Sequence, residues 1–417
     1  MLVTVIDGDT WRRIPGAQVR IGPHAARSDG RGVASIRIPL RRPLTVSIAA
    51  AGYTPAARWE ELQKYRKVTV RIYQPGLQWT MYGATPARTQ AQTGIALRPP
   101  FKIDWSQGLD GLLEFPAVVS DGVAYVGNFR GTIYALSMGN GDVLWRHETP
   151  GGEMASSPAV WGRVLIVHGM DGAVSALDRA SGRLLWRLPI GSAIESSPVV
   201  RGGIDYFGAW NGTVYALDLT RRRIVWTYGA GAKITSSGSL AGATLYIGDY
   251  GGRLLALDAA TGRLRWSGSV NGRIYGTPAV AGGRVFVPSS DGGSLTAFST
   301  AGRTLWRVNT GSYVYSSPAA WGGRVFFGSY NGVFYGVSAA SGRILWTVGT
   351  GGAISGAAVV VGGVAYAGSF SHAIYGVDAR TGRVLMRFPH GEYVPVSGNG
   401  AKLLLHGYSR LYAVRPR

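Results

Sequence analysis

The chain of 417 residues has no cysteine, little lysine and few acidic residues. Without cysteine it cannot form disulfides, thiolate metal sites or thiol nucleophiles. Lysine occurs only at positions 64, 67, 102, 233 and 402, so arginine carries nearly all of the positive charge. The 43 basic side chains outnumber the 22 acidic ones and give a formal net charge of +21. This excess predicts a surface that attracts anions such as phosphate-bearing lipid, cell-wall polymer or nucleic acid.

Long apolar runs are missing as well. No segment approaches the roughly 18 consecutive apolar residues that a membrane-spanning helix needs. Residues 1–6 read as the start of a strand and lack the basic and apolar regions of a signal peptide. We therefore expect either a cytoplasmic protein or a chain whose targeting segment lies outside this sequence.

What the sequence does contain is a regular series of large apolar residues. Successive members lie 40 or 41 residues apart, and they are Trp105, Trp145, Trp186, Trp226, Trp266, Trp306, Trp346 and Met386. A period of about 40 residues, built from short strands and glycine-rich turns, is typical of a β-propeller in which each repeat forms a four-stranded blade. We predict an all-β fold, an eight-bladed β-propeller preceded by a small β-sandwich, in which each tryptophan docks on the adjacent blade.

The chain divides into three parts. Residues 1–74 alternate apolar and polar side chains over about five strands, which predicts the β-sandwich. Residues 75–100 are rich in Gly, Pro, Thr and Gln and read as a linker that wraps onto the ring. Residues 101–417 are expected to form the propeller. The last repeat supplies only three strands, so residues 101–105 should provide the fourth and close the ring. A solvated connection is expected at residues 58–65.

Two registers of the repeat vary between blades and are the candidate binding sites. The first lies nine or ten residues after each member of the 40-residue series and should ring one mouth of the central funnel; its candidates are Glu114, Glu195, Tyr275 and Tyr315. The second is the turn between the second and third strands, with Phe129, Trp210, Tyr250, Tyr330, Phe370 and Tyr408 as a candidate binding rim. Carboxylates and tyrosines suit a polar or cationic group, and repeated aromatics suit peptide or glycan docking. Alternatively, each ring packs over its own turn.

The histidines do not show the spacing of a metal site. His168 and His406 share one repeat position, each followed by glycine at the end of a strand, and both are expected at the surface. Sequence signatures of a phosphate-binding loop, a nucleophile elbow or a zincin helix do not occur. We therefore expect no catalytic, cofactor-binding or metal-binding residues.

The repeat unit Ala-x-Asp-x-x-Ser/Thr-Gly-x-x-x-Trp occurs at residues 176–186 and 256–266, with partial copies ending at Trp226 and Met386. It resembles the tryptophan-docking repeat of the pyrroloquinoline-quinone (PQQ) propellers, which include quinoprotein alcohol dehydrogenases and BamB-type outer-membrane assembly lipoproteins. The resemblance covers residues 76–417, and the lead-in 79–83 looks like that of non-enzymatic members. In the first part, residues 15–19, 28–32 and 51–53 resemble carboxypeptidase regulatory-like sandwiches.

The resemblance implies that an enzyme of this family would hold a quinone and a divalent cation in its hub, beside a vicinal disulfide. This chain has no cysteine and is much shorter than such dehydrogenases, so we expect no enzyme and no cofactor. The leading hypothesis is a non-catalytic scaffold that binds a protein or a cell-envelope polymer, in the cell envelope or outside the cell, with a cytoplasmic location left open.

Two alternatives stay open. One is a PQQ-dependent dehydrogenase. The other is a polyanion binder, for which nucleic acid is the weaker ligand because basic stretches interleaved with aromatics do not occur. Its candidate residues are Arg12, Arg13, Arg41, Arg42, Arg66, Arg221, Arg222 and Arg223.

Overall fold

The computed structural model describes residues 1–38, 44–60 and 67–417, with the backbone alone for 58–60. The chain separates into two compact units. Unit 1 comprises Met1–Gln78 and Asn399–Ala401, and unit 2 comprises Trp79–Gly398 and Lys402–Arg417.

Unit 1 contains two sheets that share one apolar core. One sheet has the order β4 (Val33–Ser35), β1 (Leu2–Asp7), β7 (Lys67–Ile72), and the other β3 (His24–Arg27), β2 (Gln18–Ile21), β5 (Leu44–Ala49), β6 (Ala56–Glu60). Alternate residues of the strands point inward, and Val3, Val19, Val46 and Val70 are among the buried side chains. The expectation of a solvated connection is wrong for residues 58–60, which pair with β5; residues 61–65 lie outside the described part. The carboxypeptidase regulatory-like resemblance stays a prediction.

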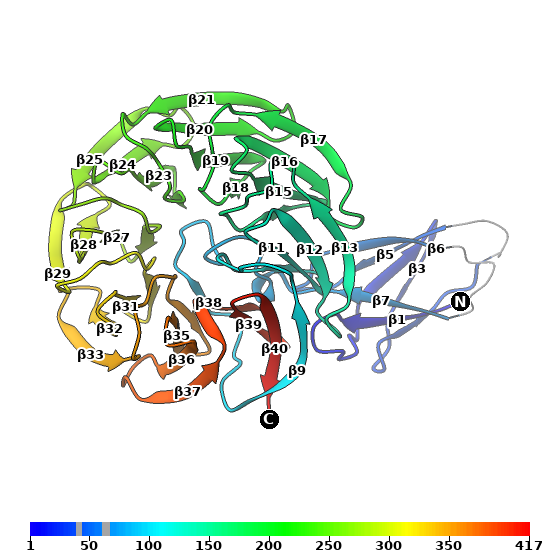
Figure 1. The fold of residues 1–417 in the computed structure, drawn as a ribbon. Coiled ribbons are helices and arrows are strands. Elements are labelled where there is room, and N and C mark those ends of the chain that lie inside the picture. The colour runs from blue at the N-terminus through cyan, green and yellow to red at the C-terminus, as the bar shows by residue number, and fades with distance from the viewer. Residues whose placement is uncertain (39–43, 61–66) are drawn as a thin grey trace. The chain divides into compact units, whose positions relative to one another are not determined.

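Unit 2 is a multi-bladed, all-β propeller, a ring of sheets with the first strand of each near the centre and the fourth outside (Figure 1). The described residues form eight sheets in the ring. The first three are β10 (Val118–Ser120), β11 (Val123–Gly127), β12 (Thr132–Ser137), β13 (Val143–Glu148); β14 (Ala159–Trp161), β15 (Val164–His168), β16 (Ala173–Asp178), β17 (Leu184–Pro189); β18 (Val199–Arg201), β19 (Ile204–Gly208), β20 (Thr213–Asp218), β21 (Arg223–Gly229).

The next three sheets repeat this order. They are β22 (Ser239–Ala241), β23 (Thr244–Gly248), β24 (Arg253–Asp258), β25 (Leu264–Ser269); β26 (Ala279–Ala281), β27 (Arg284–Ser289), β28 (Ser294–Ser299), β29 (Thr304–Asn309); β30 (Ala319–Trp321), β31 (Arg324–Gly328), β32 (Val333–Ser338), β33 (Ile344–Gly349). Second and third strands are buried on both faces and read as apolar runs, whereas fourth strands alternate because they lie at the outer edge.

The last two sheets recruit strands from elsewhere in the chain. The seventh consists of β34 (Val359–Val361), β35 (Val364–Ser369), β36 (Ala373–Asp378) and β37 (Val384–Pro389), with β8 (Ala91–Gln92) added beside β34. The eighth combines β38 (Gly391–Gly398), β39 (Leu403–Gly407) and β40 (Arg410–Pro416) with β9 (Phe101–Gly108). The closing strand is thus three residues longer than residues 101–105.

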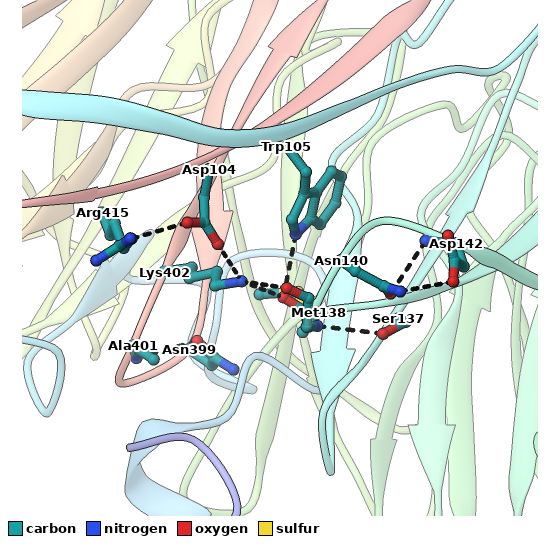
Figure 2. A network of polar contacts seen from close by, with 11 residues as sticks. Asp104, Trp105, Ser137, Met138, Asn140, Asp142, Asn399, Ala401, Lys402 and Arg415 are labelled. Atoms are coloured by element: carbon teal, nitrogen blue, oxygen red, sulfur yellow. Dashed lines mark hydrogen bonds and ion pairs between the residues drawn. The ribbon is translucent and has the colours of Figure 1, made fainter. Parts of the chain in front are cut away.

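The closing sheet is fixed by charge as well as by backbone pairing (Figure 2). The carboxylate of Asp104 on β9 accepts a hydrogen bond from Arg415 Nε at 2.8 Å and pairs with Lys402 Nζ at 2.5 Å. These partners, Lys402 first, lower the pKa of Asp104. Lys402 also donates to the carbonyl of Met138, in the turn between β12 and β13, as does the ring N–H of Trp105. The first and last strands of the ring, β9 and β40, are thus paired with each other, and Trp105 and Lys402 connect their sheet to the first sheet.

The tryptophans of the 40-residue series join neighbouring sheets. Six of them donate a ring N–H hydrogen bond of 2.9–3.2 Å to a backbone carbonyl in the turn before the next outer strand; they are Trp105, Trp145, Trp226, Trp266, Trp306 and Trp346. Trp186 packs against an apolar cluster, and Met386 lies opposite Gly376 in its sheet. The glycine of the repeat lies against the tryptophan face, and a Cβ on Gly262 would be 2.6 Å from the Trp226 ring.

Residues 79–92 follow the innermost strands of the ring. The 3-10 helix η1 (Pro75–Leu77) precedes this segment. The backbone of Trp79 exchanges hydrogen bonds with Val119 in the first sheet. Five carbonyls of the segment accept from the innermost strands of the second, fourth, fifth, sixth and seventh sheets, and they belong to Thr80, Pro86, Ala87, Thr89 and Gln90. An innermost strand has no neighbouring blade strand on its inner edge, and the segment supplies hydrogen-bond acceptors for part of that edge, as β8 does beside β34. The sequence predicts a linker that wraps onto the ring, and the structure adds the backbone hydrogen bonds by which residues 79–90 contact it.

Candidate functional site

A buried arginine anchors the segment 79–92 inside the hub. Arg88 is 0% exposed, and its guanidinium donates to the carbonyls of Gly238 at 3.0 Å and Pro198 at 2.7 Å, and also to those of Ser197 and Tyr82. Burial lowers the pKa of Arg88 to about 10, so the side chain stays charged at neutral pH. Sequence reasoning missed this residue because nothing in a glycine-rich segment marks one arginine for burial.

The four candidates for the funnel mouth lie around one small cavity. Glu114, Glu195, Tyr275 and Tyr315 line it together with Tyr82 from the segment 79–92. The cavity measures about 50 Å³, which is room for a few water-sized groups. The residues come from loops that connect an outer strand to the innermost strand of the next sheet, as the 40-residue spacing predicts.

The two carboxylates of this cavity differ in their partners. Glu195 is 8% exposed and accepts a hydrogen bond from the ring N–H of Trp210 at 3.0 Å. Burial raises its pKa, against the hydrogen bonds from Tyr275 and Trp210. Burial, and then the charge of Glu195, raise the pKa of Glu114 to about 7. The mouth therefore holds one carboxyl group, Glu195, that is fixed by two donors, and a second one, Glu114, whose pKa of about 7 lies near neutral pH.

This environment predicts a pH-dependent stability. A carboxyl whose pKa rises from 4.5 to about 7 on folding stabilises the protein at low pH and loses that contribution as the pH rises through this window. We expect Glu114→Gln to raise the unfolding free energy by about 2–3 kcal/mol relative to wild type at pH 8 and to change it little at pH 4.5. Denaturant titrations at both pH values measure this difference.

An equal effect of Glu114→Gln at both pH values would contradict the assignment. His406, whose pKa is lowered to about 4 by burial, acts with the opposite sign: its contribution is lost as the pH falls from 6.5 to 4. Because His406 is present in both proteins, its effect cancels in the comparison.

Aromatic rings form a continuous series beside this cavity. Ring centroids lie 5.4 Å apart for Tyr275 and Tyr315, 5.1 Å for Tyr315 and Tyr330, 5.9 Å for Tyr330 and Phe370, and 5.3 Å for Phe370 and Tyr393. Tyr313, with 49% of its surface exposed, contacts both Tyr315 and Tyr330. We call these six residues the aromatic mouth: Tyr275, Tyr313, Tyr315, Tyr330, Phe370 and Tyr393. Sequence reasoning missed Tyr313 and Tyr393, which lie two residues before the register position.

The two candidate registers belong to one surface. The backbone N–H of most rim aromatics donates to a carbonyl of the loop that leads into the same sheet, for example Tyr330 to Tyr313, Trp210 to Ala193, Tyr250 to Lys233 and Phe370 to Ala353. These hydrogen bonds are 2.9–3.0 Å long. They place the rim turns directly against the mouth loops, so two registers that read as separate sites in the sequence form a single face.

Two other rim aromatics, Trp210 and Tyr250, form cation–π contacts with Lys233. Lys233 Nζ lies 3.2 Å from the ring centroid of Trp210 and 5.2 Å from that of Tyr250. Phe129 and Tyr408 are 39% and 56% exposed and lie outside the ring contacts of the aromatic mouth. The six rim candidates thus do not form one uniform belt: two join the aromatic mouth, two bind Lys233, and two stand alone.

The expected surface position of His168 and His406 is wrong. His168 is 0% exposed, with Nε2 2.9 Å from Asp205 and Nδ1 2.6 Å from the carbonyl of Ser196. His406 is 1% exposed, and its Nε2 accepts the backbone N–H of Ala117. Both histidines lie at the end of the second strand of their sheet, and the start of the next sheet covers that position. Their side chains therefore form hydrogen bonds to the next sheet instead of facing solvent.

Of the arginines proposed for polyanion binding, Arg41, Arg42 and Arg66 lie outside the described residues. The others are all exposed: Arg12, Arg13, Arg221, Arg222 and Arg223. Arg221 pairs with Asp218 at 2.8 Å.

The hub does not fit a quinone cofactor. Its cavity of about 50 Å³ is far below the roughly 300 Å³ at which small-molecule pockets begin. The donors of Trp210 and Tyr275 already engage the carboxylate of Glu195. In the part of the chain that the structure describes, no three His, Cys, Asp or Glu residues cluster as metal ligands. We derive no chemical step through a quinone or its cation.

The fold and this site correspond to a known class of repeat propellers. The sequence profile described as outer membrane protein assembly factor BamB matches residues 78–204, 129–273 and 210–415. These overlapping matches cover most of the chain, and the chain belongs to this family of PQQ-like propellers.

Individual relatives are distant. The chain is 31% identical over 71 residues to the outer membrane protein assembly factor BamB of Taylorella asinigenitalis, covering 17% of this chain and 18% of that protein. It is 26% identical over 164 residues to the 1-butanol dehydrogenase (quinone) of Thauera butanivorans, covering 36% of this chain and 26% of the relative. The matches thus span about a quarter or less of these curated relatives.

Among solved structures, BamB from Moraxella catarrhalis superposes with a TM-score of 0.65 at 19% identity, over 76% of this chain and 99% of that one. This likeness shows the propeller fold. No helix among the described residues combines the length and the apolar character needed to cross a bilayer.

Proposed function

We propose that this protein is a non-catalytic binding scaffold whose aromatic mouth holds an extended segment of a protein or a cell-envelope polymer. The observation that carries the proposal is the unbroken series of ring contacts from Tyr275 to Tyr393 beside the hub cavity. Broad, rigid rings contribute contact area at a low cost in conformational entropy, and tyrosine hydroxyls add hydrogen bonds.

Three further points support a binding role. The hub cavity is too small for a drug-sized ligand, so a partner would lie across the mouth rather than inside it. The mouth loops are held in place by backbone hydrogen bonds to the rim turns, so little order has to be gained on binding. The matching family profile is described as an outer membrane protein assembly factor, and this description supports a partner in the cell envelope.

The proposal predicts that Tyr330→Ser weakens ligand binding at least tenfold, because Tyr330 contacts three other rings of the mouth. The probes are an array of short extended peptides and, separately, soluble cell-wall glycan fragments, titrated by calorimetry. Val225→Ser is the matched control, because Val225 is 49% exposed on an outer strand away from the mouth.

Two results would contradict the proposal. One is equal binding of the best probe by wild type and Tyr330→Ser. The other is a rise in melting temperature with PQQ and Ca²⁺ together with dye reduction in the presence of an alcohol, which would make the protein an enzyme.

A further inference from the structure

The two ends of the propeller carry opposite charge. The first to fourth strands of each sheet pair antiparallel, so the turns joining first to second and third to fourth strands lie at one end. Hydrogen bonds join these two turns in each of the first seven sheets, for example from the N–H of Ala259 to the carbonyl of Ala243 at 3.0 Å. In those sheets the turns at this end contain ten basic and two acidic residues, and the turns and loops at the other end contain three basic and seven acidic.

The positive end repeats one arginine from blade to blade. It directly follows the glycine of the turn before the outer strand, at Arg183, Arg263, Arg303, Arg343 and Arg383. All five side chains are exposed, and none forms an ion pair with another residue that the structure describes. We call these five residues the arginine ring. Its side chains are free to meet an external anion, unlike Arg221 or Arg179, which pair with nearby aspartates.

Exposed aliphatic side chains accompany the arginine ring. The residue after the arginine, the first of the outer strand, is Leu184, Leu264, Ile344 or Val384 in four of the five cases, and these side chains are 38–47% exposed. Single exposed apolar residues are common on proteins, but here they recur at one register position beside a cation. A surface that offers cations and apolar tips side by side fits a ligand that combines phosphate with hydrocarbon.

We propose that the arginine ring and its aliphatic neighbours form a docking surface for an anionic phospholipid bilayer. Guanidinium groups bind phosphate in bidentate fashion, and the adjacent aliphatic tips reach the boundary between headgroups and acyl chains. A soluble polyanion such as nucleic acid would satisfy the arginines but leave the aliphatic tips in water. This surface lies at the opposite end of the ring from the aromatic mouth, so the mouth would face away from the bilayer.

The test is co-sedimentation of the full chain with vesicles of phosphatidylcholine alone and of phosphatidylcholine mixed with phosphatidylglycerol, at low and high salt. We expect binding to the mixed vesicles only, weakened by salt. Arg263→Gln combined with Arg343→Gln should weaken it about 25-fold, since each surface cation contributes about fivefold. Arg130→Gln with Arg146→Gln removes the same charge away from this end and is expected to change binding by less than about threefold.

A second pair of variants separates a bilayer from a soluble polyanion. Leu264→Ser with Ile344→Ser should weaken vesicle binding while leaving binding of polyphosphate or duplex DNA unchanged. The proposal is overturned if the mixed vesicles do not bind, if the two arginine pairs weaken binding equally, or if DNA binds as tightly as the vesicles and the serine pair has no effect on either.

Discussion

Arg88→Met is expected to lower the unfolding free energy of the propeller by about 3–5 kcal/mol, because hydrogen bonds from a charged donor contribute about 1.5–3 kcal/mol each and several are lost together. The guanidinium donates to four backbone carbonyls in a fully buried position, and the variant leaves those acceptors without donors. Methionine preserves most of the side-chain volume, so the loss reports on polar contacts more than on packing. Denaturant titration followed by tryptophan fluorescence measures it.

The control for Arg88→Met is Arg98→Met. Arg98 is about half exposed and pairs with Asp378 at 3.2 Å, and such a surface pair contributes at most about 1 kcal/mol. If the two variants lose the same stability, Arg88 does not anchor the segment 79–92, and the hub closure must depend on its backbone hydrogen bonds alone.

Gly262→Ala should cost about 2–4 kcal/mol. The residue has a φ of +72°, where a Cβ costs roughly 1–2 kcal/mol, and the new methyl group would lie 2.6 Å from the Trp226 ring. The tryptophan must then leave its place, and its ring N–H loses the carbonyl of Ala259 at 3.0 Å. Thermal and denaturant unfolding of the purified variant measure the loss.

Gly242→Ala is the matched control for this position. Gly242 has a φ of +56°, but a methyl group added there would meet no atom within 4 Å, so the substitution carries only the backbone cost of about 1–2 kcal/mol. Equal losses for the two variants would show that the glycine of the repeat is required for its dihedral angle and not for the tryptophan docked on it.

The repeat made most of the ring predictable. A tryptophan every 40 residues sets the blade period, and the shortage of strands after Met386 points to β9 as the closing strand. The blade period and the closing strand both follow from the spacing of residues within the repeat, which can be read from the sequence alone. The mouth residues Glu195 and Tyr275 were predicted in the same way. They occupy the same position in different repeats, and in a ring of repeats such residues surround the same central cavity.

Contacts between distant segments were not predictable. The bridge from His168 to Asp205 joins residues 37 positions apart whose meeting depends on how two sheets pack. Arg88 bonds to carbonyls more than 100 residues away, and backbone carbonyls carry no sequence signal. The merging of rim and mouth depends in the same way on backbone hydrogen bonds between turns, so two registers were predicted where the molecule has one face.

The pairing of β9 with β40 delays closure of the ring during synthesis of the chain. Arg415 and Asp104 are 311 residues apart in the chain, and at roughly 5–20 residues per second a ribosome needs about 15–60 s to cover that distance. Throughout this interval β9 is a nascent strand without its partner, exposed to other strand edges. The ring therefore cannot close before β40 has been synthesised, and until then β9 is an unpaired strand edge.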